Sequence, residues 1–222
     1  CNLKLKKIFI KSFLKGANIS DSFKNKETFF QIKISERNSK IFYFENNSLK
    51  FEQNFAFGTD IIINDISKVT SLKADTVKLI LDKVELRNEF SENELIKKEL
   101  FVNDAFRKIK KRLIYNIAEA RIKEIIELVL SKNINFSHFN KGFNNVFFEI
   151  DAKSQLKNLE ETFKSIFSIY RNYDLIIIDT ITSESLINTA NKLVHFGWKN
   201  EAIPISQFKK SKIARFFDTI FG

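Results

Sequence analysis

The sequence predicts an α+β fold, in which an antiparallel sheet of about five or six strands packs on a long central helix and a smaller helical or α/β C-terminal part follows. Short strand-like segments occupy residues 27–84, and the intervals between them are too short for the helices that connect parallel strands. Residues 103–132 are the longest helix-compatible run, without Gly or Pro. With 222 residues, 44% of them hydrophobic, the chain is large enough to bury a core.

Several segments before residue 84 are predicted to be strands because they are rich in Phe, Ile or Val and are separated by turn-forming residues. Asn46-Asn47-Ser48 is typical of a hairpin turn. The last segment alternates in the manner of a half-buried strand. The predicted strands are residues 29–34, 41–44, 49–57, 61–63 and 77–82.

The predicted central helix, residues 103–132, carries an apolar stripe at spacings of three and four residues. Such a helix is not stable alone in water and needs a sheet or other helices to cover the stripe. Asn103 is its predicted N-cap, and a short helix at 92–100, capped by Ser91, precedes it. The stripe consists of Phe106, Ile109, Leu113, Ile117 and Ala120 and broadens through Ile122, Ile125, Ile126, Val129 and Leu130.

Strands and helices alternate in the last third of the chain. Asp174 and Asp179 flank a strand that is predicted to be buried on both faces, and Gly197 is suited to a left-handed cap at the end of a helix. The predicted elements are a strand at 146–150, a helix at 151–170, a strand at 175–178, a helix at 183–195 and a basic amphipathic helix at 207–221. The expected domains are a basic amphipathic segment at 1–22, an α+β domain at 23–150 and a C-terminal part at 151–222.

Residues 28–150 carry the segments FGTDIIINDISKV, TVKLILDKVEL and FNNVFFEI in that order, with two predicted helices before the last. This order resembles domain-of-unknown-function family 4230, whose members are typically anchored at a bacterial membrane. The resemblance implies an anchor but no activity. The chain departs from the family in having no proline after Leu81 and in keeping only Ala118 and Ala120 of an alanine pattern. The matching residues are Gly58, Asp65, Ile66, Ser67 and Lys68.

The single cysteine is Cys1. A chain that begins with Cys resembles a mature bacterial lipoprotein, in which a signal peptide has been removed and the cysteine sulfur carries a diacylglycerol. The resemblance implies that Cys1 attaches the chain to membrane lipid. The alternative is a chain boundary that happens to fall on a cysteine.

The segment after Cys1 has the pattern of a basic amphipathic helix. Leu5, Ile8, Phe9 and Phe13 fall on the side opposite the lysines. Lysines in the headgroup layer of an anionic membrane contribute about 1 kcal/mol each. In the alternative interpretation, this is a first helix that docks its apolar side on the protein. The lysines predicted to contact the membrane surface are Lys4, Lys7, Lys11 and Lys15.

The net charge of +10 does not by itself predict a nucleic-acid partner. The 37 basic residues are 30 Lys and 7 Arg, and they are dispersed among 27 acids. Arginine, the residue that forks onto guanine or phosphate, is scarce. We therefore expect no nucleic-acid partner.

No set of residues forms a recognisable catalytic motif. The two histidines, His138 and His195, are far apart, and the five glycines are scattered, so neither a zinc site nor a phosphate loop can be assembled. Asp179, after a buried strand and before a helix, occupies a position where α/β proteins place functional carboxylates. It is also typical of a strand end followed by a capped helix. We expect no catalytic residue, no metal and no cofactor.

These observations favour a membrane-anchored bacterial envelope lipoprotein, on the periplasmic side or the outer surface, with a non-enzymatic binding or structural role. Its expected partners are membrane lipid and an unknown envelope or host protein. Two alternatives stay open. One is a surface lipoprotein that binds host molecules, as an adhesin or in immune evasion. The other is a cytoplasmic protein that handles nucleic acid or phosphate through Asp179 and the basic helix at 207–221.

Overall fold

The computed structural model describes residues 7–24, 26–84, 91, 93–133, 144–151, 160–169 and 173–198. The chain divides into two compact units. Unit 1 comprises Cys1–Glu27, Glu45–Ser48 and Ile181–Gly222, and unit 2 comprises Thr28–Phe44 and Leu49–Thr180. The predicted helix at 207–221 lies outside the described residues.

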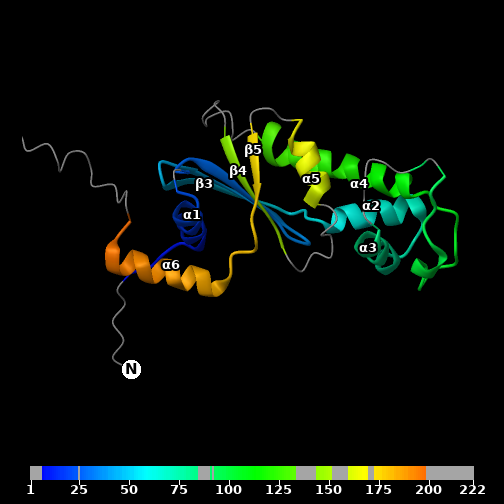
Figure 1. The fold of residues 1–222 in the computed structure, drawn as a ribbon, viewed down its shortest axis with the longest axis horizontal. Coiled ribbons are helices and arrows are strands. Elements are labelled where there is room, and N and C mark those ends of the chain that lie inside the picture. The colour runs from blue at the N-terminus through cyan, green and yellow to red at the C-terminus, as the bar shows by residue number, and fades with distance from the viewer. Residues whose placement is uncertain are drawn as a thin grey trace, which may run out of the picture. The chain divides into compact units, whose positions relative to one another are not determined.

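The centre of unit 2 is a five-stranded sheet in the order β3-β2-β1-β4-β5 (Figure 1). β1 pairs antiparallel with β2, whereas β1 with β4 and β4 with β5 are parallel. Ile32 of β1 lies opposite Ile41 of β2 on one side and Phe148 of β4 on the other. The strands are β1 (Phe29–Ile34), β2 (Ser39–Glu45), β3 (Ser48–Phe55), β4 (Asn144–Ile150) and β5 (Tyr173–Ile177).

The predicted antiparallel sheet is wrong, because two segments that were expected to be strands are helices. α2 (Asp60–Thr70) and α3 (Ala74–Lys83) replace the strands predicted at 61–63 and 77–82. With α4 they make the crossover between β3 and β4 long enough to bring β4 parallel to β1. In α2 the buried residues Ile62, Ile63 and Ile66 recur at helical spacing, which a run of three apolar residues does not disclose.

The central helix is shorter than predicted. α4 spans Lys111–Ile126 and continues through a π-helical turn, Glu127–Ser131. Asn103 is not its N-cap, because the backbone before α4 is extended and Ile96 N–H donates to the Ile109 carbonyl at 2.8 Å. The helix predicted at 92–100 is reduced to a 3₁₀ turn, Lys98–Leu100. Pairing of residues 95–96 with 109–110 therefore takes the place of the first two predicted turns of helix.

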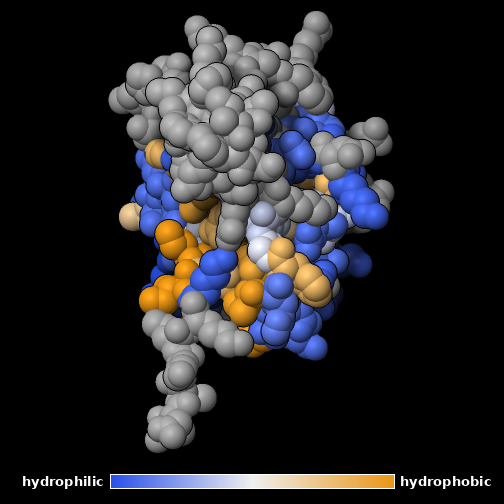
Figure 2. All heavy atoms as spheres, turned by 90° about the vertical axis from the view of Figure 1, so that its left-hand side faces the viewer, coloured by the Kyte–Doolittle hydropathy of each residue, from blue (hydrophilic) through white to orange (hydrophobic). Residues whose placement is uncertain are grey.

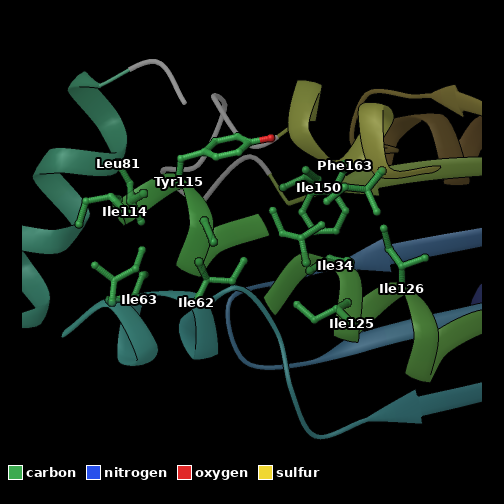
Figure 3. Close-up of a cluster of buried hydrophobic side chains, with 14 of the residues drawn as sticks. Ile34, Ile62, Ile63, Leu81, Ile114, Tyr115, Ile125, Ile126, Ile150 and Phe163 are labelled. Carbon is green, nitrogen blue, oxygen red and sulfur yellow. The ribbon is translucent and has the colours of Figure 1, made fainter. Parts of the chain in front are cut away.

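The core of unit 2 lies between one face of the sheet and the helices α2, α3, α4 and α5 (Glu160–Phe167). Figure 3 shows side chains from these helices and from β1 and β4 pointing toward one another. Phe148 packs on Phe163 and Phe167, with ring centroids 4.9 and 5.7 Å apart. The sheet residues in this core are Phe30, Ile32, Ile34, Ile41, Tyr43, Val146, Phe148 and Ile150.

The opposite face of the sheet is also buried. Phe29 lies 5.1 Å from Phe44 and 5.1 Å from Phe147 between ring centroids, and none of the three rings is exposed. Gln31, Lys33 and Glu149 follow on the same face, because side chains alternate along a strand. This face, called the polar face below, is where charged groups enter the sheet.

Unit 1 is built on α1 (Lys11–Ser22) and α6 (Ser183–Phe196), which lie side by side. The prediction of α6 is confirmed: Thr182 caps it by accepting a hydrogen bond from Ser185 N–H at 3.2 Å, and Gly197 ends it with φ +70°. α1 continues through Gly16 to Ser22. The hairpin turn is confirmed, since Asn46 and Asn47 have φ of 50° and 60°. Among the described residues, no helix has the length and apolar character that a membrane span requires.

Candidate functional site

The carboxyl ends of β1, β4 and β5 meet at one edge of the sheet, because these strands are parallel. The backbone ties the edge together: Asp151 N–H donates to the Ile34 carbonyl and Ile178 N–H to the Phe148 carbonyl, both at 2.9 Å. The chain turns from β1 to β2 on one side and from β4 to β5 on the other, so the strand order reverses between β1 and β4. Ligands of open α/β sheets bind outside such a reversal.

An ion-pair network occupies this point. Lys33 Nζ lies 2.9 Å from Glu149 Oε1 and 3.7 Å from Asp151 Oδ2. Gln31 Nε2 donates to Glu149 Oε2 at 3.2 Å. The exposed fraction of the side chain rises from 0% at Glu149 through 18% at Lys33 to 29% at Asp151, so the network reaches from the interior to solvent. The ammonium and the amide together compensate the fully buried Glu149 carboxylate.

The turn between β1 and β2 borders the network. Thr59 N–H donates to the Ser35 carbonyl at 3.0 Å and Asp60 N–H to the Glu36 carbonyl at 2.9 Å, so the start of α2 holds the turn by its carbonyls. A Cβ on Gly58 would lie 2.2 Å from the Ser35 carbonyl oxygen, which explains the glycine there. The turn itself contains no glycine, and the N–H groups at the start of α2 are used for this support.

A second candidate site is the groove between α2 and α4, called the α2–α4 groove, with a volume of about 450 Å³. Its floor is apolar, and Val69 is 60% exposed. Arg121 pairs with Asp65 of α2 and, at 2.6 Å, with Glu124. The lining residues are Asp65, Lys68, Val69, Asn116, Ile117, Ala120, Arg121 and Glu124.

Unit 1 has a polar pocket of about 360 Å³ between α1 and α6. Asn18 Nδ2 donates to Ser185 Oγ at 2.7 Å and to Thr189 Oγ1 at 3.1 Å, and Lys192 pairs with Asp21 at 3.5 Å. These bonds join the two helices. Figure 2 shows hydrophobic residues at the surface beside hydrophilic ones, and among the described residues of unit 1 the exposed large apolar ones are Ile8, Ile10, Ile187 and Phe196.

The residues that the sequence predicted at a membrane surface do not form one described group. Cys1 and Lys4 lie outside the described residues. Lys7 and Lys11 are exposed, whereas Lys15 is buried, with 8% of the residue exposed. The lipid attachment at Cys1 stays a prediction.

The candidate chemical residues are also dispersed. Asp179 is exposed just after β5, and His195 is exposed on α6. His138 is not among the described residues, and in the described part of the chain no three His, Cys, Asp or Glu side chains are grouped to hold a metal ion. Sequence reasoning missed Lys33 and Glu149. Their signal is a charged residue inside each of two otherwise apolar strands, FFQIKI and NNVFFEI.

No family model and no curated protein matches this chain. Among solved structures, MreB 5 of Spiroplasma citri bound to AMPPNP matches with a TM-score of 0.54 and 13% identity, over 82% of this chain and 57% of that one. The ADP-bound form of the same protein gives a TM-score of 0.49 at 11% identity, over 86% and 60%. The ethanolamine utilization protein EutJ from Carboxydothermus hydrogenoformans gives 0.47 at 9% identity, over 73% and 46%. The chain thus spans between 46% and 60% of the length of these proteins.

The first of these likenesses shows the fold: over 82% of its length the chain is folded like MreB 5. The predicted envelope lipoprotein, its lipid and host partners and the surface-lipoprotein alternative are therefore wrong. The alternative of a protein that handles phosphate agrees better with this fold. Localisation to the cell envelope stays a prediction.

MreB 5 was solved with bound AMPPNP, and two observations count against phosphate binding at the sheet edge of this chain. First, the Lys33 ammonium is already paired with the carboxylates of Glu149 and Asp151. Second, phosphate loops present backbone N–H groups to the ligand. In this chain the N–H groups of Thr59 and Asp60 are bonded to the turn instead.

Proposed function

We propose that this chain is the assembly unit of an actin-like protein and associates with a second copy of itself through the α2–α4 groove. The observation that carries the proposal is an open apolar groove in unit 2, whereas the ammonium at the sheet edge is already paired. In this proposal the chain has no catalytic activity of its own. Solvent-exposed Val69 is the centre of the contact.

The charges around the α2–α4 groove support a self-complementary contact. The groove carries two acids and two bases, Asp65 and Glu124 with Lys68 and Arg121. A patch with both signs in equal number can face its own copy across a two-fold axis with opposite charges in register. The apolar floor would supply the desolvated centre and the charges the rim. The net charge of +10 opposes association at low ionic strength, so added salt should strengthen it at first.

Sedimentation velocity over a series of concentrations tests this proposal. The wild-type chain should associate with rising concentration, and Val69→Lys should weaken association at least about tenfold, a loss of about 1.4 kcal/mol. Val102→Lys is the matched control, since Val102 is also exposed, at 68%, but does not line the groove. A monomeric wild-type chain at every concentration, or equal effects of the two variants, would refute the proposal.

Adenine nucleotide binding is the second candidate function, favoured by the AMPPNP in the MreB 5 structure. Nucleotide binding would agree with the alternative of a protein that handles phosphate. Titration of the chain with a fluorescent ATP analogue, with and without Mg²⁺, distinguishes the two functions. Saturable binding that unlabelled ATP displaces would establish the second candidate, and its absence would leave assembly as the function.

A further inference from the structure

We infer that two copies of the chain meet antiparallel in the α2–α4 groove, so that Lys68 of each copy pairs with the Arg121 cluster of the other. The Arg121 cluster consists of Arg121 and the two acids that it binds, Asp65 and Glu124. The inference rests on the proposed self-association and adds the orientation of the two copies and the residue that selects it. Because such a contact has a two-fold axis, it closes on itself and gives a dimer.

The charges of the groove are separated along its length. α2 and α4 lie side by side (Figure 1), and Arg121 of α4 pairs with Asp65 of α2. Arg107, which precedes α4, donates to the carbonyl of Thr70, the last residue of α2, at 3.2 Å. The two helices are therefore antiparallel. Lys68 lies about one helical turn beyond Asp65 toward Thr70, so it is displaced along the groove from the Arg121 cluster.

The two groups of charges have opposite sign. Two carboxylates share one guanidinium in the Arg121 cluster, which leaves it with one net negative charge. Lys68 is exposed, and its ammonium has no ion-pair partner among the described residues. The groove is thus neutral as a whole but polarised along its axis. An antiparallel copy brings each ammonium to a negative cluster, whereas a parallel copy would place like charges against each other.

The apolar floor borders both groups of charges. Val69 follows Lys68 in α2 and is 60% exposed. In α4, Ile117 and Ala120 precede Arg121 by at most about one turn and line the same groove. In the antiparallel contact these apolar side chains meet those of the second copy and exclude water. The ion pairs at their border are strengthened, because the attraction between charges rises as water is removed.

Reversing the charges one at a time tests the orientation. In sedimentation velocity on the full chain, Lys68→Glu and Glu124→Lys should each weaken self-association at least about tenfold, because like charges then face each other. Both side chains are exposed, so both variants should fold with the wild-type melting temperature. Lys97→Glu and Glu99→Lys are the matched controls. Both positions are exposed and outside the groove, and the two substitutions change the net charge by the same amounts.

Mixing the two charge-reversed chains supplies the decisive comparison. An equimolar mixture of Lys68→Glu and Glu124→Lys chains should associate about as tightly as the wild type, because each reversed group then faces its opposite. The double variant Lys68→Glu with Glu124→Lys should do the same by itself. Chains that are weakened separately but recover together identify the pair directly, since neither a loss of folding nor a change in net charge gives that result.

The outcomes separate this inference from the proposed function. A wild-type chain that stays monomeric at every concentration refutes self-association and the orientation with it. If the wild-type chain associates and Val69→Lys weakens it, self-association through the groove holds. In that case the antiparallel orientation is overturned by charge reversals that act no more strongly than their controls, by a mixture that does not recover, or by growth beyond a dimer.

Discussion

Both faces of the unit 2 sheet contain buried side chains, but they differ in chemistry. Toward the helices, β1 and β4 present apolar side chains, among them Ile32, Ile34 and Phe148. On the polar face the same strands alternate between Phe rings and the network of Lys33 and Glu149. Burial alone therefore does not identify a structural core. Glu149 is a buried charge on one face, and the described residues of the other face include none. Because burying a charge costs free energy, the need to fill the core does not explain this residue.

The largest expected effects come from the adjacent residues Phe148 and Phe147, which point to opposite faces. Each is 0% exposed, so Phe148→Ala and Phe147→Ala should each lower the free energy of unfolding by about 3–5 kcal/mol. Urea unfolding with both variants measures the difference. A cost below about 1 kcal/mol for Phe147→Ala alone would mean that the polar face is not packed as a core, and the comparison would fail.

The ion pair on the polar face should give the next largest effect. Lys33→Met leaves the Glu149 carboxylate buried without its ammonium and should cost about 3 kcal/mol. The double variant Lys33→Met with Glu149→Leu removes both charges and should be more stable than Lys33→Met alone. A double-mutant cycle in urea gives the coupling, expected to exceed about 1 kcal/mol. Additive effects of the two substitutions would show that the pair does not compensate Glu149.

Strand positions in the unit 2 sheet could be predicted from the sequence, but the pairing of the strands could not. The strand positions on both faces could be predicted, since Phe- and Ile-rich segments such as 29–34 and 41–44 are strands in the structure. The hairpin at Asn46-Asn47 followed from turn chemistry. Strand pairing could not be predicted, because the segments 61–63 and 77–82 are too short for the spacing of their apolar residues to distinguish a strand from a buried helix. Because α2 and α3 were predicted as strands, the helical crossover that makes β4 parallel to β1 was not predicted.

The candidate site was missed for a related reason. Lys33 and Glu149 are 116 residues apart, and only the parallel register of β1 and β4 brings them together. In the sequence, each of them is only a single charged residue in an apolar strand, which does not indicate a site. Val69 and Arg121 of the α2–α4 groove are likewise joined only by helix packing, and α2 was expected to contain a strand. Local sequence patterns predict many of the strands and helices. The two candidate sites could not be predicted in this way, because they depend on contacts between residues far apart in the sequence.

Ionic contacts on the helix-covered side lie at its solvent-exposed rim, so their effects should be smaller. The nearby Thr76 side chain and the Lys73 backbone N–H, which donates to Asp104 Oδ2 at 3.0 Å, hold the pKa of Asp104 below its ordinary value of 3.8. A carboxyl whose pKa is lowered by folding stabilises the protein above the unfolded pKa, near pH 4, and loses this contribution as the pH falls through the folded pKa. Asp104→Asn should therefore destabilise the chain at pH 7 and flatten the acid limb of its stability profile.

The Asp104 prediction is checked by thermal melts between about pH 2 and pH 7. Asp174→Asn, at an exposed position of β5, is the matched control and should leave the profile unchanged. An Asp104→Asn variant with the wild-type acid limb would contradict the prediction. If Asp104→Asn lowered the stability at pH 7 more than Lys33→Met does, the expected order, with the larger effect on the polar face, would be wrong.

The smallest expected effect is a gain in stability at the end of α2, on the helix-covered side. Ser71 is exposed and left-handed, with φ 54° and ψ 32°, a conformation that costs an L-residue about 1–2 kcal/mol and glycine almost nothing. Glycine also gives the unfolded chain more freedom, which offsets about 0.4–1 kcal/mol of that gain. Ser71→Gly should therefore raise the melting temperature by about 1–3 °C. Ser67→Gly, inside the same helix, should lower it, because glycine in a helix interior costs about 1 kcal/mol. Opposite signs for the two serines would show that this rim is limited by backbone conformation, whereas the polar face is limited by charge.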